Sequence, residues 1–238
     1  QLSELGHEIT IASFESELHN QDISGLTDIS KVYTAKGEFT DYNFVSVLKS
    51  TFTRRPITIQ HRMSISIMSK ILSRIDSDFD IVIFEGLHTL NFFELIQKYF
   101  PNTKTLLRHV NVEFELISQR AYQQNNPLLK FFLFDQARLM KKFEIESLKK
   151  VDGITFISNL DQRKLEDNIK IHQPTLVNPP GAPTTNEINF EKRPNNHLIA
   201  FSNWKWPPNL EGLKWFLQKV WPIIYNANPD VKFTIAGN

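Results

Sequence analysis

The chain has 238 residues, a formal net charge of +1 and no cysteine. This length can bury a hydrophobic core in one domain or two. The near-neutral charge argues against nucleic acid as a partner, and the lack of cysteine excludes disulfides, thiolate metal sites and a cysteine nucleophile. We expect no membrane-spanning helix, because no apolar run reaches about 18 residues.

Apolar runs alternate with segments of helical spacing up to about residue 177, which is typical of an α/β domain with a parallel sheet. The strongest predicted strand, Asp80–Glu85, is a continuous apolar run that we expect to be covered on both faces. Further strands are predicted at residues 8–14, 31–35, 103–108, 153–158 and 175–177. Helices are predicted at residues 43–52, 63–75, 90–100, 112–124, 127–150 and 160–168, with a polar loop at 15–29.

The stretch from Asn178 to Pro183 contains three prolines and a glycine. Such a stretch continues neither a helix nor a central strand. We interpret it as the crossing between two α/β units, the alternative being an ordinary surface loop. The predicted division is a first domain at residues 1–178, a hinge and linker at 179–196, and the start of a second domain at 197–238.

The second unit is short. It is predicted to contain strands at 197–201 and 231–236, and between them an amphipathic helix that Pro222 stops or kinks. Two strands and one helix are too little for an independent parallel α/β domain. At the other end, Gly6 closes a helix whose beginning is missing. We therefore expect the chain to be cut at both ends.

Open parallel sheets bind ligands just beyond the carboxyl ends of their strands. This rule selects Glu85 and His88 after one strand, and Ser158 and Asp161 after another. His88 is a candidate by position. Ser158 and Asp161 are interpreted as a helix N-cap and a first-turn acid.

The densest candidate cluster follows the strand between these two. Arg108 and His109 are followed closely by Asn111 and Glu113. An imidazole here could orient a hydroxyl group or remove its proton near neutral pH. The alternative is structural, with Asn111 capping the next helix and Glu113 in its first turn. The two interpretations are compatible for His109.

Three other features have simpler interpretations. Glu144 and Glu146 are predicted on a solvated helix face beside Lys141 and Lys142. The run Phe131–Phe134 is predicted to be a buried helical turn, with a surface for a lipid carrier or a membrane as the alternative. The histidines are scattered, and no motif indicates a metal site.

The loop from Ser202 to Asn209 lies between a strand and a helix N-terminus. Such an N-terminus presents free amides that favour anions, and Lys205 could add charge for a diphosphate. Trp204 and Trp206 could stack on a ring or simply pack. A rigid turn before an amphipathic helix is the alternative.

Several motifs in this order resemble one known family. They are LGHEIT at 5–10, RHVNVE at 108–113, RLMKKFE at 138–144, DGITFIS at 152–158, VNPPG at 177–181, FSNWKWPPNLEGLKW at 201–215 and FTIAG at 233–237. Together they resemble retaining glycosyltransferases of the GT-B fold, family 4, of the capsular and exopolysaccharide type. The resemblance covers about 230 residues.

The resemblance implies an α/β fold with two Rossmann-like domains. The N-terminal domain would bind a glycan or lipid-linked acceptor, and the C-terminal domain a nucleotide-sugar donor. His88 and His109 are the catalytic candidates. The expected acceptor-binding residues are Arg108, Asn111, Glu113 and Glu85, and the expected donor-binding residues are Ser202, Asn203 and Lys205.

The resemblance further implies that no metal ion or other cofactor is needed, because protein groups and a helix dipole stabilise the leaving diphosphate. It implies a cytoplasmic enzyme, with peripheral contact at the inner face of the membrane left open. Oligomeric state is not predicted.

The chain departs from the family in three respects. The first strand with its glycine-rich loop would precede Gln1, and the donor-binding glutamate pair would follow Asn238. The usual Arg and Lys of the first C-domain loop are replaced by a Trp-rich loop with only Lys205. We therefore expect this chain alone to be inactive. Two alternatives remain open, a non-catalytic α/β module that binds glycan or protein, and a GT-B-like nucleotide-sugar epimerase.

Overall fold

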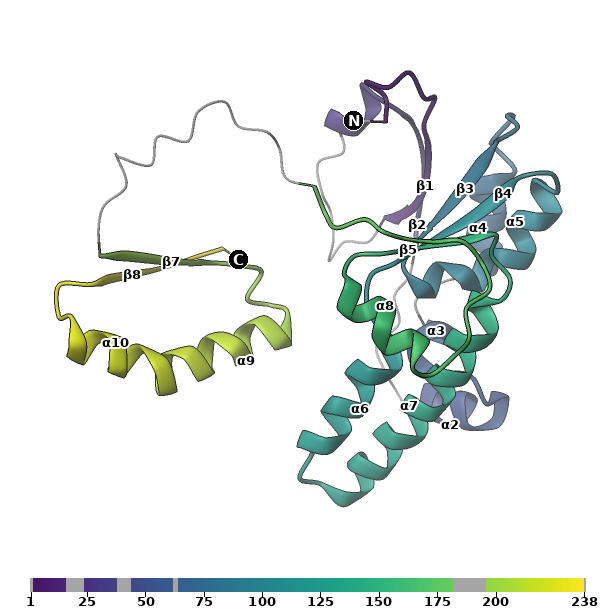
Figure 1. The fold of residues 1–238 in the computed structure, drawn as a ribbon. Helices are drawn as coiled ribbons and strands as arrows, with labels where there is room; N and C mark the ends of the chain where they lie inside the picture. Colours follow the sequence, from purple (N-terminus) through teal and green to yellow (C-terminus); the bar gives the residue numbers. More distant parts are fainter. Residues whose placement is uncertain (1, 16–23, 38–43, 62–63, 182–195, 238) are drawn as a thin grey trace. The chain divides into compact units, whose positions relative to one another are not determined.

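The computed structural model describes residues 2–15, 24–37, 44–61, 64–181 and 196–237 (Figure 1). The chain divides into two compact units, Gln1–Gly181 and Ala182–Asn238. Each unit contains parallel strands with helices, which confirms the α/β fold class. Ala182, Pro183 and the predicted polar segment up to residue 195 lie outside the described residues.

The first unit contains all six predicted strands in two parallel sheets. β1 (Thr10–Glu15) pairs with β2 (Lys31–Lys36). The larger sheet has the order β3-β4-β5-β6. Its strands are β3 (Ile81–Glu85), β4 (Lys104–His109), β5 (Gly153–Phe156) and β6 (Thr175–Val177).

Helices connect these strands in chain order. They are α1 (Ser24–Thr27), α2 (Phe44–Thr53), α3 (Ile57–His61), α4 (Ile65–Leu72), the 3₁₀ helix η2 (Leu87–Phe92), α5 (Phe93–Tyr99), α6 (Glu113–Gln123), α7 (Pro127–Leu148) and α8 (Asn159–Glu166). The sequence did not predict α1 and α3, which are too short to show a helical period. Residues 16–23 of the predicted polar loop, and residues 43 and 63 of two predicted helices, lie outside the described residues.

The strand β3 is less covered than its sequence predicts. Phe84 is buried in the core, but Ile81 and Ile83 are exposed. The expectation of burial on both faces is therefore wrong for this strand. The reason is that Ile81 and Ile83 lie on one face of the strand, which is open to solvent, while Val82 and Phe84 on the other face pack on the core.

The helices α6 and α7 form a hairpin. The Asn126 side chain caps α7 by accepting from the amides of Leu128 and Leu129, at 3.0 and 3.2 Å. Near the loop, the rings of Tyr122 and Phe134 meet edge to face at 5.0 Å between centroids. The hairpin leads away from β4 and β5, with its connecting loop at the far end (Figure 1).

The second unit is a parallel pair of strands with one interrupted helix. β7 (His197–Phe201) pairs with β8 (Lys232–Ala236). Between them, α9 (Pro207–Trp215) passes through a π-helical turn, η4 (Phe216–Val220), into α10 (Trp221–Ala227). Pro222 falls in the first turn of α10, where its missing N–H is tolerated. The helix therefore does not stop at Pro222. A π-helical turn just before the proline lets it continue into α10.

Asp152 fixes the start of β4 beside the start of β5. Its carboxylate accepts from the Thr105 amide and hydroxyl, both at 2.9 Å, and pairs with Lys104 Nζ at 3.0 Å. The backbone hydrogen bond from Thr105 is the main cause that lowers the pKa of Asp152, and the hydrogen bond from Lys104 comes next. The folded protein therefore favours the ionised carboxylate.

We predict that Asp152→Asn lowers the free energy of unfolding by about 1 kcal/mol at pH 7, because hydrogen bonds to a charged, partly exposed acceptor are lost. The folded-state pKa lies below the unfolded value. The contribution is therefore complete above about pH 4 and declines as pH falls through the folded pKa. Urea denaturation between pH 2 and 7 measures it.

Asp78→Asn is the control, since Asp78 is exposed and no hydrogen bond of its side chain is found among the described residues. A wild-type advantage over Asp152→Asn that stays constant down to pH 2 would contradict the assignment.

Candidate functional site

The candidate site lies at the carboxyl edge of the four-stranded sheet. In the parallel register Glu85 stands beside Arg108, and His109 stands beside Phe156. The ends of β3, β4 and β5 are therefore level. The residues that follow these strands meet at one edge, as the sequence predicted from chain order.

At the end of β3, an ion pair crosses to β4. Arg108 Nη1 donates to Glu85 Oε2 at 3.0 Å, and the Gly86 amide donates to the Arg108 carbonyl at 3.0 Å. Glu85 is exposed and Arg108 is half-buried. The structure thus brings these two predicted acceptor-binding residues together on an accessible surface.

His88 follows Glu85 by three residues, and its ring lies against Gly86. Gly86 has φ 83° and ψ 152°, a region that is essentially restricted to glycine. A Cβ atom at this position would lie 2.9 Å from His88 Cε1. The glycine therefore lets the half-buried imidazole lie against the backbone at the end of β3.

His109 has a different environment from the one expected. It is completely buried, and its Nε2 lies 2.6 Å from Glu144 Oε1 on α7. The other carboxylate oxygen, Oε2, accepts from the Phe114 amide at 3.3 Å. The ring does not reach the surface. In this structure His109 therefore does not face a ligand, contrary to the expectation. Its catalytic role stays a prediction.

Glu144 is the residue that the sequence interpretation missed. It was expected on a solvated face, but it is fully buried, whereas Glu146 is exposed and lies 3.8 Å from Lys142. The spacing contains the signal, because Glu144 is four residues after Met140 and four before Leu148, both buried on the same face of α7. A carboxylate inside such an apolar stripe requires a buried partner.

The polar residues after β4 are only partly as predicted. Asn111 is exposed and does not cap the next helix, because Val112 occupies the N-cap position and no side chain accepts there. Glu113 lies in the first turn of α6, as predicted. After β5, Ser158 does cap α8, accepting from the Asp161 amide at 3.1 Å.

In the second unit, the predicted donor residues lie in the turn between β7 and α9. Asn203 Oδ1 accepts from the Lys205 amide at 3.0 Å, and the Asn203 carbonyl accepts from the Asn209 side chain at 3.0 Å. The Lys205 side chain is exposed. The Trp204 indole donates to the Ala236 carbonyl at 2.9 Å, which fixes the half-buried ring against the end of β8.

Ser202 is tightly enclosed by the end of β8. Gly237 has φ 117°, and a Cβ atom there would lie 1.9 Å from the Ser202 carbonyl oxygen. Only glycine allows this approach. The turn with Ser202, Asn203 and Lys205 is therefore held in one shape by its own unit.

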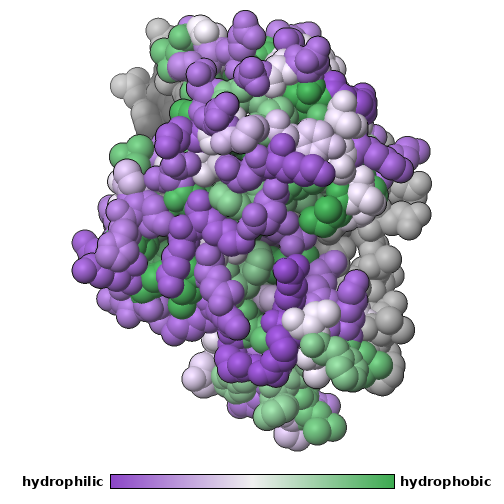
Figure 2. Space-filling model, turned by 90° about the vertical axis from the view of Figure 1, so that its right-hand side faces the viewer, coloured by the Kyte–Doolittle hydropathy of each residue, from purple (hydrophilic) through white to green (hydrophobic). Residues whose placement is uncertain are grey.

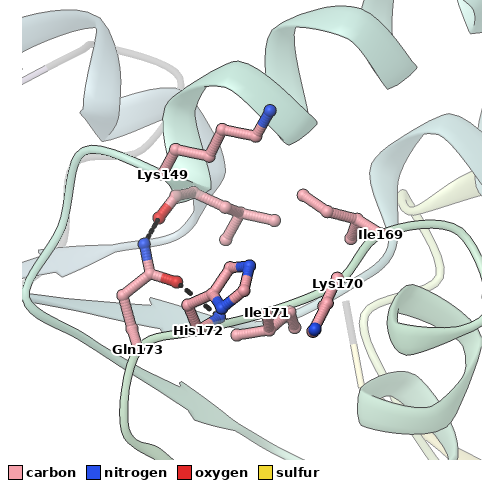
Figure 3. Close-up of a pocket in the computed structure, with 7 residues that line it drawn as sticks. Lys149, Ile169, Lys170, Ile171, His172 and Gln173 are labelled. Atoms are coloured by element: carbon pink, nitrogen blue, oxygen red, sulfur yellow. Dashed lines mark hydrogen bonds between the residues drawn. The ribbon is translucent and has the colours of Figure 1, made fainter.

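A hollow lies at the opposite edge of the four-stranded sheet, where α7 ends and β6 is about to begin (Figure 3). It encloses 460 Å³ and is lined mainly by Ile169, Ile171, His172 and Gln173. Gln173 Nε2 donates to the Leu148 carbonyl at 3.0 Å. Because the hollow is at the amino edge, it is separate from the candidate site.

Within the described ranges, no three His, Asp or Glu residues lie close enough together to hold a metal ion. The expectation that no metal is needed stays a prediction. No helix among the described residues combines the length and apolar content required to cross a bilayer.

Comparison with known proteins adds three likenesses, and no family model matches the chain. The chain is 24% identical over 246 residues to an uncharacterized 44.6 kDa protein in the cps region of Klebsiella pneumoniae, and it spans 58% of that protein. It resembles the crystal structure of Medicago truncatula UGT71G1 complexed with UDP-glucose, with a TM-score of 0.52 and 14% identity. That likeness covers 97% of this chain and 65% of the other. The chain has a fold of the GT-B type.

A second GT-B structure, apo UGT2 of Phytolacca americana, matches with a TM-score of 0.44 at 10% identity, over 85% of this chain and 52% of the other. The chain thus spans less than two thirds of the proteins it matches. The likeness to UGT71G1 shows the GT-B type of fold, and family 4 membership and the retaining type stay predictions.

We predict that Glu144→Ala lowers the free energy of unfolding by about 3 kcal/mol, because it leaves the His109 ring and the Phe114 amide without a buried acceptor. Glu144→Gln, which keeps an acceptor oxygen, is expected to cost less. The control Glu146→Ala removes an exposed carboxylate two residues away and should change stability by less than about 0.5 kcal/mol. Equal urea midpoints for Glu144→Ala and Glu146→Ala would refute this role.

We predict that Gly86→Ala costs about 2 kcal/mol of stability, because alanine is strained at this φ and ψ. It also displaces the His88 ring, which histidine side-chain NMR shifts would report. Adding His88→Ala to Gly86→Ala removes the steric conflict and should restore only part of the stability. Gly25→Ala, where a Cβ meets no atom within 4 Å, is the control. A Gly86→Ala protein with unchanged His88 resonances would contradict the contact.

Proposed function

We propose that this chain is part of a glycosyltransferase, which moves a sugar from a nucleotide-sugar donor to a glycan or lipid-linked acceptor. The observation that carries the proposal is the likeness to UGT71G1, a structure complexed with UDP-glucose, over 97% of the chain. The order of motifs along the sequence supports the same reaction. The donor would bind to the unit that contains β7, and the acceptor to the unit that contains β4.

The finer assignment is to a retaining, family 4 hexosyltransferase that works in the cytoplasm on a capsular or exopolysaccharide, with peripheral contact at the membrane. The motif order motivates this assignment. The relative in the cps region of Klebsiella pneumoniae supports a polysaccharide context. Analysis of the anomeric configuration of the product tests the retaining type directly.

On the acceptor side, we assign the reacting surface to Glu85, His88 and Arg108. An imidazole can take a hydroxyl proton near neutral pH, and His88 is the accessible one of the two candidate histidines. The guanidinium of Arg108, already held by Glu85, can donate to sugar hydroxyls. Asn111 and Glu113 extend the same edge.

His109 would support this surface from below, and Glu144 would hold its ring. The pair connects the end of β4 to α7 and to the start of α6. A shift of this pair moves Arg108, its neighbour in sequence.

On the donor side, we assign the diphosphate to the turn at Ser202, Asn203 and Lys205. This turn precedes the N-terminus of α9, where the helix dipole favours negative charge. The first two residues of α9, Pro207 and Pro208, have no N–H, and the amides of Asn209 and Leu210 donate to the Trp206 carbonyl, so the assignment rests on the dipole and on side chains rather than on free amides. The Lys205 ammonium adds a full charge. These groups would neutralise the leaving diphosphate without a metal ion, so excess EDTA should leave turnover unchanged.

We predict that Lys205→Ala in the full-length protein weakens nucleoside diphosphate binding about tenfold, because one charge-assisted hydrogen bond is lost. Isothermal titration with UDP, GDP and ADP measures the effect. Lys214→Ala, which removes a lysine charge from the last turn of α9, the helix that follows Lys205, is the matched control. Equal affinities for the two variants would contradict the role of Lys205 in donor binding. If the full-length protein bound none of these nucleotides, the result would count against the proposed glycosyltransferase function.

Two other outcomes would replace the proposal. Interconversion of a labelled nucleotide-sugar in the absence of acceptor would identify an epimerase. Glycan binding without turnover by the full-length protein, unchanged by His88→Ala, would identify a non-catalytic module. Transfer of label to an acceptor, lost with His88→Ala, is the expected result. Turnover by residues 1–238 alone would refute the predicted inactivity of this chain.

A further inference from the structure

The end of the α6–α7 hairpin presents large apolar side chains to solvent. Leu128 is 82% exposed, Phe131 77% and Tyr122 71%, and Leu129 is also exposed. Phe131 was expected to be buried with its neighbours, and this expectation is wrong. Figure 2 shows hydrophobic residues gathered at the lower end of the first unit, where the hairpin loop lies in Figure 1. We refer to these four residues as the tip.

Specific contacts hold the end of the hairpin in place. Asn126 caps α7 immediately before Leu128, and the Tyr122 ring is held against Phe134. The apolar side chains at this helix end are exposed to solvent in the folded unit, and monomeric proteins seldom leave large apolar patches uncovered.

The charge beside the tip is mainly positive, because the nearest acid on α7, Asp135, is paired with Arg138 at 2.8 Å. Residues 116–134 contain Arg120 and Lys130 and no aspartate or glutamate. In a two-fold contact between copies, these cations would face the same cations of the partner. Anionic lipid headgroups complement them instead, while the apolar side chains enter the acyl boundary and the tyrosine lies at headgroup level.

The tip also lies on the same side of the sheet as the candidate site. Glu144 marks the level of the end of β4, through its contact with His109. Phe131 precedes Glu144 by thirteen residues on the same continuous helix, which corresponds to roughly 20 Å along the axis. The hairpin therefore projects beyond the carboxyl edge, the edge where Glu85, His88 and Arg108 lie.

We propose that the tip formed by Tyr122, Leu128, Leu129 and Phe131 docks on an anionic lipid membrane and holds the carboxyl edge of the sheet close to the bilayer surface. The docking does not require sugar transfer. It deepens the proposed function by committing it to a membrane-borne acceptor, and that part rests on the proposed function.

The test uses the full-length protein and flotation with vesicles of phosphatidylcholine alone or with one quarter phosphatidylglycerol. Wild type should bind the anionic vesicles, and less so at high salt, because screening weakens the charge term. Leu128→Ser should lower the partition coefficient at least tenfold, as should Phe131→Ser. Lys130→Glu should lower it for anionic vesicles only.

Two matched controls separate docking from general surface effects. Leu160→Ser changes an exposed leucine at the same helical position of α8 as Leu128 occupies in α7, the second residue. Lys170→Glu reverses an exposed charge at the opposite edge of the sheet. Both should bind vesicles as wild type does, and all variants should keep the wild-type melting temperature.

The contrary results are distinct. Absence of vesicle binding by wild type would overturn the proposal, as would an equal loss with Leu160→Ser. A dimer in sedimentation equilibrium that Leu128→Ser dissociates, without vesicle binding, would assign the tip to a second copy. Vesicle binding without sugar transfer would support membrane docking and contradict the proposed function. Transfer to a soluble acceptor without vesicle binding would support the proposed function and contradict membrane docking.

Discussion

The buried pair of His109 and Glu144 is the interaction on which the arrangement of the first unit depends. One carboxylate holds the end of β4 through the imidazole and the beginning of α6 through the Phe114 amide, while its own backbone belongs to α7. A charged or strongly polar pair without solvent is costly unless its geometry is fixed. This desolvation cost is offset only when β4, α6 and α7 are positioned so that both hydrogen bonds of Glu144 form. The pair therefore specifies where the hairpin leaves the sheet.

That register gives the functional surface its two components. The ion pair of Arg108 and Glu85 lies on the solvent side of the same strand ends whose interior side carries His109. The chemistry that the sequence assigned to one cluster is thus divided between two layers. His88 and Arg108 are accessible for a ligand, and His109 and Glu144 form the support beneath them. This division explains how one short segment can be rich in polar residues without all of them touching a substrate.

The sequence predicted much of the fold and less of the site. Alternation of apolar runs with helical segments was sufficient to predict all the described strands. Strand coverage was overestimated at Ile81 and Ile83, because a continuous apolar run does not report whether both faces of the strand are covered by other elements. The predicted cap role of Asn111 was wrong, since the first residue of a helix depends on the path of the loop before it.

Glu144 could have been predicted from its place in the apolar stripe of α7, but its partner, 35 positions earlier, could not. Nothing in the local sequence reports that pairing.

The unbroken α7 helix has one more consequence, for insertions and deletions. Its carboxyl half is fixed to the core by Gln136, Met140 and Glu144, and its amino half carries Leu128 and Phe131. Each residue added or removed between these halves rotates the tip by about 100° and moves it by about 1.5 Å. A single-residue indel there would turn Phe131 away from its present direction, whereas a change of seven residues would nearly preserve it. Only insertions or deletions close to a whole number of helical turns keep the direction of the tip. The lengths of such changes in related chains would therefore show whether selection preserves that direction.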